Sequence, residues 1–180
     1  MMILDLLHSE ISSCNLCDLA LTRTKAVPGE GPCPAGIMLV GEAPGADEDV
    51  TGRPFVGRAG RLLDRSLSLA GIERSEVFIT SVVKCRPPLN RKPKSIEIES
   101  CHNYLQSQID LIHPKVIGVM GNTAARALLN LQGITALRGR VLQGRFLVTY
   151  HPAAVLRNNH LQEAFVSDLK KIKEMGSGDQ

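Results

Sequence analysis

The chain has 180 residues, 43% of them hydrophobic and 22% charged, with a formal net charge of +3. This length allows one domain with a well-filled core and is too short for two ordinary ones. The composition is that of a globular protein, and so small a net charge indicates no partner by itself. No apolar run approaches the roughly 20 residues needed to cross a bilayer, and the first residues lack a basic leader. We therefore expect a protein without a membrane partner that remains in the cytoplasm.

Four short apolar runs are the strongest structural signal along the chain. Each is nearly continuous and rich in β-branched residues, which is typical of strands buried on both faces of a sheet. The predicted strands are Ile37–Val40, Val77–Val83, Val116–Met120 and Phe146–Tyr150.

Helical patterns precede, separate and follow these strands. The predicted helices are 1–12, Arg58–Ala70, Ser95–Ile112, Asn122–Leu131 and Leu161–Met175. Gly71 is a candidate C-cap for the second helix, and Ser95 is a candidate N-cap for the third. The alternation predicts a three-layer α/β/α fold with a central, mostly parallel four-stranded sheet. We expect one domain over residues 1–180, with a disordered tail at about 176–180.

Unusual segments directly follow each predicted strand. They are GEAPGADED, KCRPP, GNTAAR and HPAAVLRN, in chain order. Ligands bind at the carboxyl ends of the strands in an open α/β sheet. The sequence therefore predicts a binding cleft at that edge.

The first of these segments combines glycines with carboxylates. Gly41 and Gly45 allow a tight turn and a close approach of the backbone to a ligand. The acids favour the first turn of a helix electrostatically, which is one explanation for Asp47 and Asp49. A cleft that polarises a water needs one inward carboxylate, and Glu42 or Glu48 could supply it.

Two ring side chains are candidates for a functional role. Phe55 lies in a glycine-rich loop, in a chain with only 3% aromatic residues. It could plug the core or stack on a planar base. His151 directly follows a strand and precedes a proline, which favours a functional role over a structural one.

Two basic stretches are candidates for phosphate contact. KCRPPLNRKPK, from Lys84 to Lys94, holds five cations and no acid. The second stretch, LRGRVLQGR, contains Arg138, Arg140 and Arg145. Each is either a solvated loop or a surface that holds phosphates.

The five cysteines indicate metal chemistry, because a reducing cytoplasm disfavours disulfides. Cys14 and Cys17 form a C-x2-C pair, with Cys85 and Cys101 as distant partners. This spacing suits tetrahedral zinc or a four-cysteine iron–sulfur cluster. A redox C-x2-C is disfavoured, because the pair does not follow a strand. Cys33 has no partner at ligand spacing and is expected to be a free thiol.

Taken together, the motifs resemble those of the thermostable-type, family 4 branch of the uracil-DNA glycosylase superfamily. The resemblance runs from about Cys14 to Asn158 and rests on C-x2-C, VPGEGP, GEAPGADED, GRPFVGRAG, VVKCRPP, Cys101 and YHPAAVLRN in the family's order. It implies a monofunctional DNA repair enzyme that flips uracil out of DNA and hydrolyses its N-glycosidic bond, leaving an abasic site. It also implies a prokaryotic protein that works as a monomer beside the chromosomal DNA, on single- or double-stranded uracil-containing substrates.

The resemblance assigns a role to each matching position. The implied ligands of a structural [4Fe–4S] cluster are Cys14, Cys17, Cys85 and Cys101. The implied catalytic residues are Glu42, Glu48 and His151. The implied uracil-binding residues are Gly41, Phe55, Ser81 and His151, with His151 facing uracil O2. The DNA-binding candidates are Lys84, Arg86, Arg91, Arg138, Leu156 and Arg157, the last two in a segment that resembles a loop entering the duplex.

Three questions stay open at this stage. Ser81 stands where the family usually has asparagine, and its hydroxyl offers fewer hydrogen bonds than an amide. Either a neighbour or water compensates, or base specificity is altered or broadened. A non-catalytic iron–sulfur protein that binds damaged DNA is a further alternative. Glu42, Glu48 and Asp49 lie too close in sequence for us to say which carboxylate orients the water.

The segment Gly133–Arg145 lacks the histidine with which a related branch of the superfamily cross-links to DNA. We therefore expect turnover without a stable covalent adduct.

Overall fold

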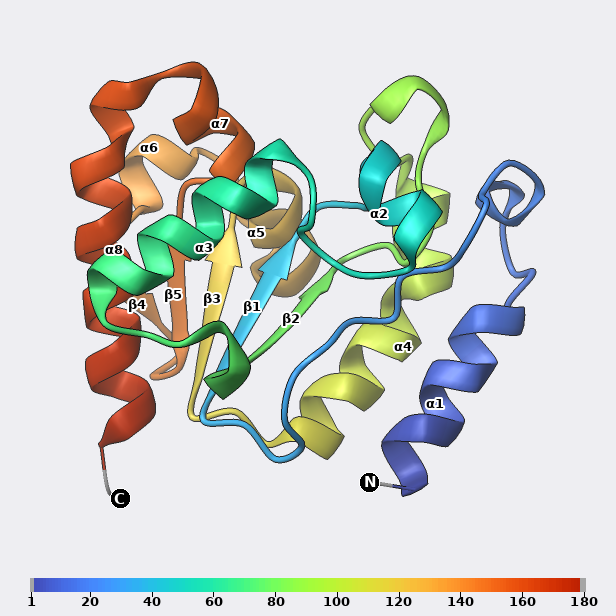
Figure 1. The fold of residues 1–180 in the computed structure, drawn as a ribbon, viewed down its shortest axis with the longest axis horizontal. Helices are drawn as coiled ribbons and strands as arrows, with labels where there is room; N and C mark the ends of the chain where they lie inside the picture. Colours follow the sequence, from blue (N-terminus) through green and yellow to red (C-terminus); the bar gives the residue numbers. More distant parts are fainter. Residues whose placement is uncertain (1, 179–180) are drawn as a thin grey trace.

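A five-stranded sheet forms the centre of the computed structural model, which describes residues 2–178 (Figure 1). The strands are β1 (Ile37–Gly41), β2 (Val77–Ser81), β3 (Val116–Met120), β4 (Val141–Leu142) and β5 (Phe146–Thr149). Their order is β2-β1-β3-β5-β4, and only the β4–β5 pair is antiparallel. The four predicted strands and their mostly parallel arrangement are confirmed.

The predicted number of strands is wrong by one, because β4 was not anticipated. This two-residue strand pairs with β5 at the edge of the sheet. Gln143 and Gly144 both have positive φ, at 48° and 74°, which allows the tight reversal between the two strands. Two residues are too few to produce a recognisable strand pattern.

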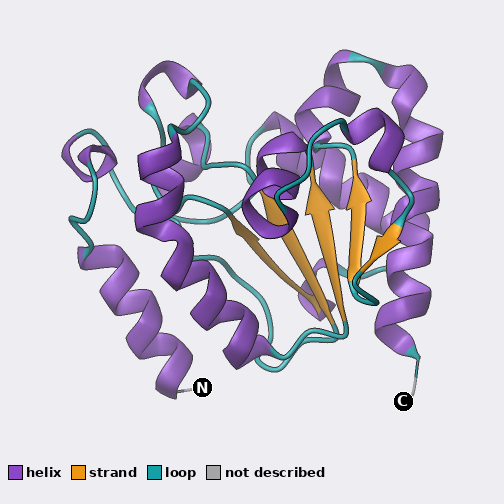
Figure 2. Ribbon diagram, turned by 180° about the vertical axis from the view of Figure 1, so that it is seen from behind, coloured by secondary structure: helices purple, strands orange, loops and turns teal. Residues whose placement is uncertain are grey.

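Helices cover both faces of the sheet, which confirms the three-layer α/β/α arrangement (Figures 1 and 2). One face carries α1 (Met2–Ser13), α4 (Ser95–Ile112) and α5 (Asn122–Leu129), which bury their apolar sides against it. The other face carries α3 (Arg58–Ala70), α7 (Pro152–Arg157) and α8 (Gln162–Ser177). Short helices α2 (Ala46–Thr51) and α6 (Ile134–Leu137), and single turns η1 (Asp18–Leu21), η2 (Arg74–Glu76), η3 (Pro88–Asn90) and η4 (Asn159–Leu161), complete the chain.

Several element boundaries differ from the prediction for local reasons. Gly71 ends α3 in a left-handed conformation, as predicted. Lys94 is the N-cap of α4 and Ser95 its first residue, because Glu97 accepts a 2.7 Å hydrogen bond from the Lys94 N–H. Helix α5 ends at Leu129, since Asn130 is left-handed.

Strand β1 and helix α1 each end one residue later than predicted, and β5 ends one residue earlier. Larger differences lie at the ends of β2 and α8. Strand β2 ends at Ser81, two residues earlier than predicted, although the N–H groups of the next two residues still donate to the carbonyls of Gly41 and Glu42. Helix α8 begins one residue late and continues through Ser177, so residues 176 and 177 are not a disordered tail. Residues 179–180 lie outside the described part of the chain. No helix among residues 2–178 is long and apolar enough to cross a membrane.

Candidate active site

A cleft of about 600 Å³ opens at the carboxyl ends of the strands. The loop after β1, the Phe55 loop, the end of β2, the basic segment after it and the start of α7 all contribute to its wall. Among the predicted site residues, the cleft is lined by Glu42, Glu48, Phe55, Ser81, Arg91, His151 and Arg157. The topology thus brings together segments that are more than 100 residues apart in sequence.

Phe55 lies against the end of β1 in a way that only glycine permits. A Cβ atom added to Gly41 would stand 2.5 Å from Cζ of Phe55. The Phe55 ring also faces His151, with ring centroids 5.7 Å apart and planes at 37°. Phe55 itself has a φ of 50°, an unfavourable backbone conformation for an aromatic residue. Surrounding contacts must therefore hold the Phe55 loop in place.

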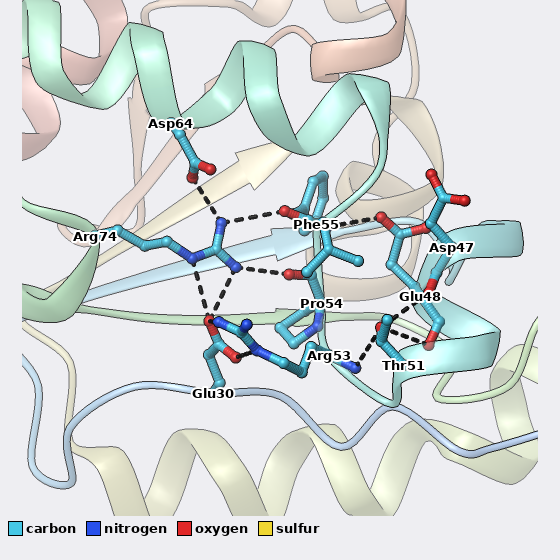
Figure 3. Close-up of polar contacts among 10 residues, drawn as sticks. Glu30, Asp47, Glu48, Thr51, Arg53, Pro54, Phe55, Asp64 and Arg74 are labelled. Carbon is cyan, nitrogen blue, oxygen red and sulfur yellow. Dashed lines mark hydrogen bonds and ion pairs between the residues drawn. The ribbon is translucent and has the colours of Figure 1, made fainter.

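Arg74 provides those contacts (Figure 3). Its guanidinium donates hydrogen bonds of 2.6 Å to the Pro54 carbonyl and 3.2 Å to the Phe55 carbonyl. It also pairs with Asp64 at 2.7 Å and Glu30 at 3.1 Å. Sequence reasoning missed Arg74, because no local pattern links η2 to a loop 19 residues earlier.

Glu30 joins this network from the loop before β1. It accepts hydrogen bonds of 2.8 and 3.1 Å from Arg53, in addition to its bonds from Arg74. These bonds, first those from Arg53, lower the pKa of the Glu30 carboxyl. Both arginines therefore face an ionised carboxylate, which holds residues 53–55 of the Phe55 loop in place.

The two oxygens of Glu48 are engaged by the backbone. One accepts N–H bonds from Val56 at 2.9 Å and Gly57 at 2.8 Å, and the other accepts from Gly45 at 3.0 Å. Asp49 is buried and accepts from the Thr24 N–H at 2.9 Å. Both carboxylates therefore organise the loops around the cleft.

Glu42 differs from these two acids. Its Oε2 accepts a short hydrogen bond from the Thr123 hydroxyl in the first turn of α5. Its Oε1 has no hydrogen-bond partner among the described residues, and the side chain lines the cleft. Of the three carboxylates that the sequence could not separate, Glu42 is the one that lines the cleft and also has an oxygen without a hydrogen-bond partner among the described residues. Sequence reasoning missed Thr123, although it lies in the segment GNTAAR.

His151 presents a defined hydrogen-bonding state. It is the N-cap of α7, where its Nδ1 accepts a 3.1 Å hydrogen bond from the Ala153 N–H. A neutral ring must therefore carry its proton on Nε2. Burial, and next the Arg157 charge, lower the pKa of His151 to about 4. The buried Nε2 has no partner within residues 2–178, so it is a donor without an acceptor.

Ser81 lies at the end of β2, buried at the back of the cleft. Its carbonyl accepts a 2.7 Å hydrogen bond from Nζ of Lys84. Lys84 is only 1% exposed and also donates to Thr80 and Gln108, each at 2.7 Å. Burial lowers the pKa of Lys84 to about 7. The prediction that Lys84 contacts DNA is wrong, because its amine is enclosed between β2 and α4.

The other DNA-binding candidates fall into two groups. Arg91 and Arg157 line the cleft, although Arg91 is also paired with Glu97 at 2.6 Å. Arg86 lies on the same loop as Arg91 and donates to Asn90 at 2.7 Å. Arg138 points inward, where it pairs at 2.5 Å with the fully buried Asp168. Its charge is neutralised there, which argues against the predicted phosphate contact.

The four predicted metal ligands line one small cavity beneath the basic loop. It is bounded by Cys14 and Cys17 from the segment after α1, with Cys85 and Cys101 opposite. Cys33 lies elsewhere and donates weakly to the Leu111 carbonyl. Within residues 2–178, no group of three or more His, Cys, Asp or Glu side chains is placed to hold a single ion.

Two hydrogen-bond donors contact sulfurs of this cavity. Arg23 donates to Sγ of Cys85 at 3.0 Å, and the Lys84 N–H donates to Sγ of Cys101 at 3.4 Å. Burial raises the pKa of Cys85 to about 11 and also raises that of Cys101. Burial therefore disfavours the charged thiolate form of both side chains.

Comparison with known proteins yields a family and close relatives. The family model for the uracil DNA glycosylase superfamily matches residues 28–173. The type-4 uracil-DNA glycosylase of Pyrobaculum aerophilum is 49% identical over 175 residues, covering 91% of this chain and 89% of the relative. The type-4 enzyme of Archaeoglobus fulgidus is 45% identical over 184 residues, covering 96% and 92%. That of Thermotoga maritima is 41% identical over 179 residues, covering 95% and 93%.

Proposed function

Because this chain belongs to the uracil DNA glycosylase superfamily, we propose that it excises uracil from DNA, hydrolysing the N-glycosidic bond and leaving an abasic site. The relatives that match it over most of their length are named type-4 uracil-DNA glycosylases. The observation that carries the proposal is the single cleft in which Glu42, Phe55 and His151 meet. The comparisons give no support to a non-catalytic sensor or to a broadened base specificity.

Base binding follows from the wall of the cleft. A base inside a duplex is out of reach, so it must be flipped out at an unstacking cost of a few kcal/mol. The Phe55 ring offers a flat apolar surface for the flipped base. Ser81 stands at the end of β2 in the same cleft, where its hydroxyl can hydrogen-bond an edge of uracil.

His151 suits stabilisation of the leaving group. When the bond between C1′ and N1 breaks, its electron pair leaves with the base, and negative charge spreads to the uracil oxygens. The Nε2–H of a neutral His151 supplies a buried donor for uracil O2. Such a preorganised donor is worth more in a water-poor site than in solvent.

Glu42 suits activation of the water. Its Oε1 accepts a proton as the water oxygen bonds to C1′, and that proton then passes to the uracil anion. The negative charge of Glu42 also favours the positive charge that develops on the sugar. Thr123 fixes the carboxylate by donating to the other oxygen.

We infer that Cys14, Cys17, Cys85 and Cys101 hold a [4Fe–4S] cluster. Four sulfur donors around one cavity, with an arginine and a backbone N–H directed at two of them, fit such a group. When bound, the cluster would tie the segment after α1 to the basic loop and α4, away from the reacting atoms. Purified protein should be yellow-brown and contain about four iron atoms per chain. Cys85→Ala should lose the iron and Cys33→Ala should keep it, whereas colourless protein with zinc would contradict this inference.

The proposed partner is uracil-containing DNA in either strand form, bound by a monomer in the cytoplasm of a prokaryote beside the chromosome. The test is release of free uracil from matched single- and double-stranded oligonucleotides, measured by chromatography. Thymine-containing oligonucleotides serve as the control. Uracil release in at least one strand form supports the function, and tight binding without release refutes it.

A further inference from the structure

Leu89 is the most exposed large apolar side chain among residues 2–178, at 96%. It also has a φ of 55°, in the left-handed region that glycine adopts freely and leucine does not. Packing and backbone preference therefore both disfavour leucine at this position. A contact with a partner outside the folded chain would account for leucine at this position.

The position of Leu89 indicates where that contact is made. Leu89 stands at the tip of the loop between β2 and α4, in which Pro87, Asn90, Arg91 and Lys92 line the cleft. In Figure 1 this yellow-green loop projects beyond α2. Because residues on both sides of Leu89 line the cleft, the exposed leucine lies at its rim, where DNA would have to approach to deliver a base.

The loop is built to hold this side chain outward. The Asn90 N–H donates to the Pro87 carbonyl at 3.0 Å, and Arg86 donates to Oδ1 of Asn90 at 2.7 Å. At the next residue, two hydrogen bonds of 2.6 and 2.9 Å connect Arg91 to Glu97 in α4. A braced loop loses little conformational freedom when it binds.

The charges around Leu89 match a nucleic acid. Arg86, Lys92 and Lys94 share its loop and form no ion pair within the described part of the chain. Cations can hold the phosphates while an apolar tip enters a base step. By contrast, the predicted duplex-entering residue Leu156 is half-buried and packs against the core.

We propose that Leu89 is an apolar wedge that enters duplex DNA at the base step beside the flipped nucleotide. This proposal rests on the proposed function and places the point of entry in the loop between β2 and α4, outside the α7 segment that the family resemblance indicated. The wedge occupies the space left in the stack, so it slows the return of the base. A single strand has no intact stack to fill and gains little from it.

The test compares duplex and single-stranded substrates with otherwise identical sequence. Leu89→Ala should lower kcat/KM on duplex DNA by about tenfold and change the single-strand value less than about twofold. Leu89→Gly should lower kcat/KM on duplex DNA by as much, although glycine adopts the positive φ of this position without strain. Leu89→Phe should retain the wild-type kcat/KM on duplex DNA. Leu69→Ala, an exposed leucine of α3, is the matched control.

A second readout keeps this proposal separate from catalysis. The fluorescence of 2-aminopurine next to uracil in a duplex reports unstacking even if no base is released. Leu89→Ala should reduce the fluorescence rise that wild-type protein produces. An unchanged rise and an unchanged duplex-to-single-strand ratio would overturn the wedge. Binding to anionic lipid vesicles is measured as well. If Leu89→Ala loses vesicle binding that wild-type protein has, and keeps wild-type DNA binding, Leu89 contacts a membrane and the wedge is overturned.

Discussion

Arg74 donates a 3.2 Å hydrogen bond to the backbone carbonyl of Phe55 and so connects η2 to the loop that carries the ring we propose to stack on the base. The same guanidinium binds Pro54, Asp64 and Glu30, which makes it the centre of the network (Figure 3). We predict that Arg74→Met lowers kcat/KM on uracil DNA by about tenfold, because a misplaced ring no longer aligns the base.

Arg74→Lys should recover only part of this loss, since one ammonium cannot reproduce the planar fork of an arginine. Urea unfolding of each variant separates misplacement from global destabilisation. Asp64→Asn, which removes one charge at the edge of the network, is the control and should stay within about twofold of wild type. Wild-type kinetics in Arg74→Met would exclude the positioning role.

Thr123 should control the position of Glu42, the carboxylate that we propose to orient the water. Thr123→Val removes the hydroxyl that donates to Glu42 and keeps the side-chain shape, so single-turnover cleavage should slow by about tenfold. Thr123→Ser keeps the donor and should restore most of the rate. If the valine and serine variants cleave equally fast, the hydroxyl has no role in positioning Glu42.

The lowered pKa of His151 predicts how the stability of the protein depends on pH. Its pKa is about 4 in the folded protein, below its ordinary value of about 6.5. The unfolded chain therefore binds more protons between these values, and the free energy of unfolding should fall as the pH drops through this window. Urea midpoints across this range should show a weaker pH dependence in His151→Asn than in wild type. An equally steep dependence would show that other groups cause it.

Lysines on the same segment should behave differently in DNA binding. Lys92 is exposed at the cleft, so Lys92→Ala should reduce the salt dependence of binding by about one released ion. Lys84 is enclosed, so Lys84→Met should lower the urea midpoint and leave the salt slope unchanged. Fluorescence anisotropy over a range of salt concentrations measures both. A smaller slope for Lys84→Met would mean that its amine reaches the DNA.

The α/β/α fold and four of its five strands could be predicted from the sequence, because buried parallel strands have a strong pattern. Runs such as Val116–Met120 are apolar throughout, and their ends place the motifs at one edge. The order of the motifs also indicated the residues that line the cleft. The edge strand Val141–Leu142 escaped prediction because two residues carry no periodicity.

The supporting contacts of the site depend on tertiary structure and could not be predicted. Arg74 and Thr123 lie 19 and 81 residues from the partners they hold. Lys84 looked like part of a basic surface, but its side chain turns inward behind Ser81. The positions of charged residues along a sequence do not reveal which of their side chains point to solvent and which are buried.

The most direct test of the central claim is single-turnover release of uracil by wild-type protein and by Glu42→Gln. Glu48→Gln serves as a comparison, with the folded fraction of each protein measured by urea unfolding. We predict that wild-type protein releases uracil and no thymine, and that Glu42→Gln remains folded, binds DNA and is slowed by at least about 100-fold. Wild-type protein that binds uracil-containing DNA and releases no base, or a Glu42→Gln variant as fast as wild type, would contradict the account.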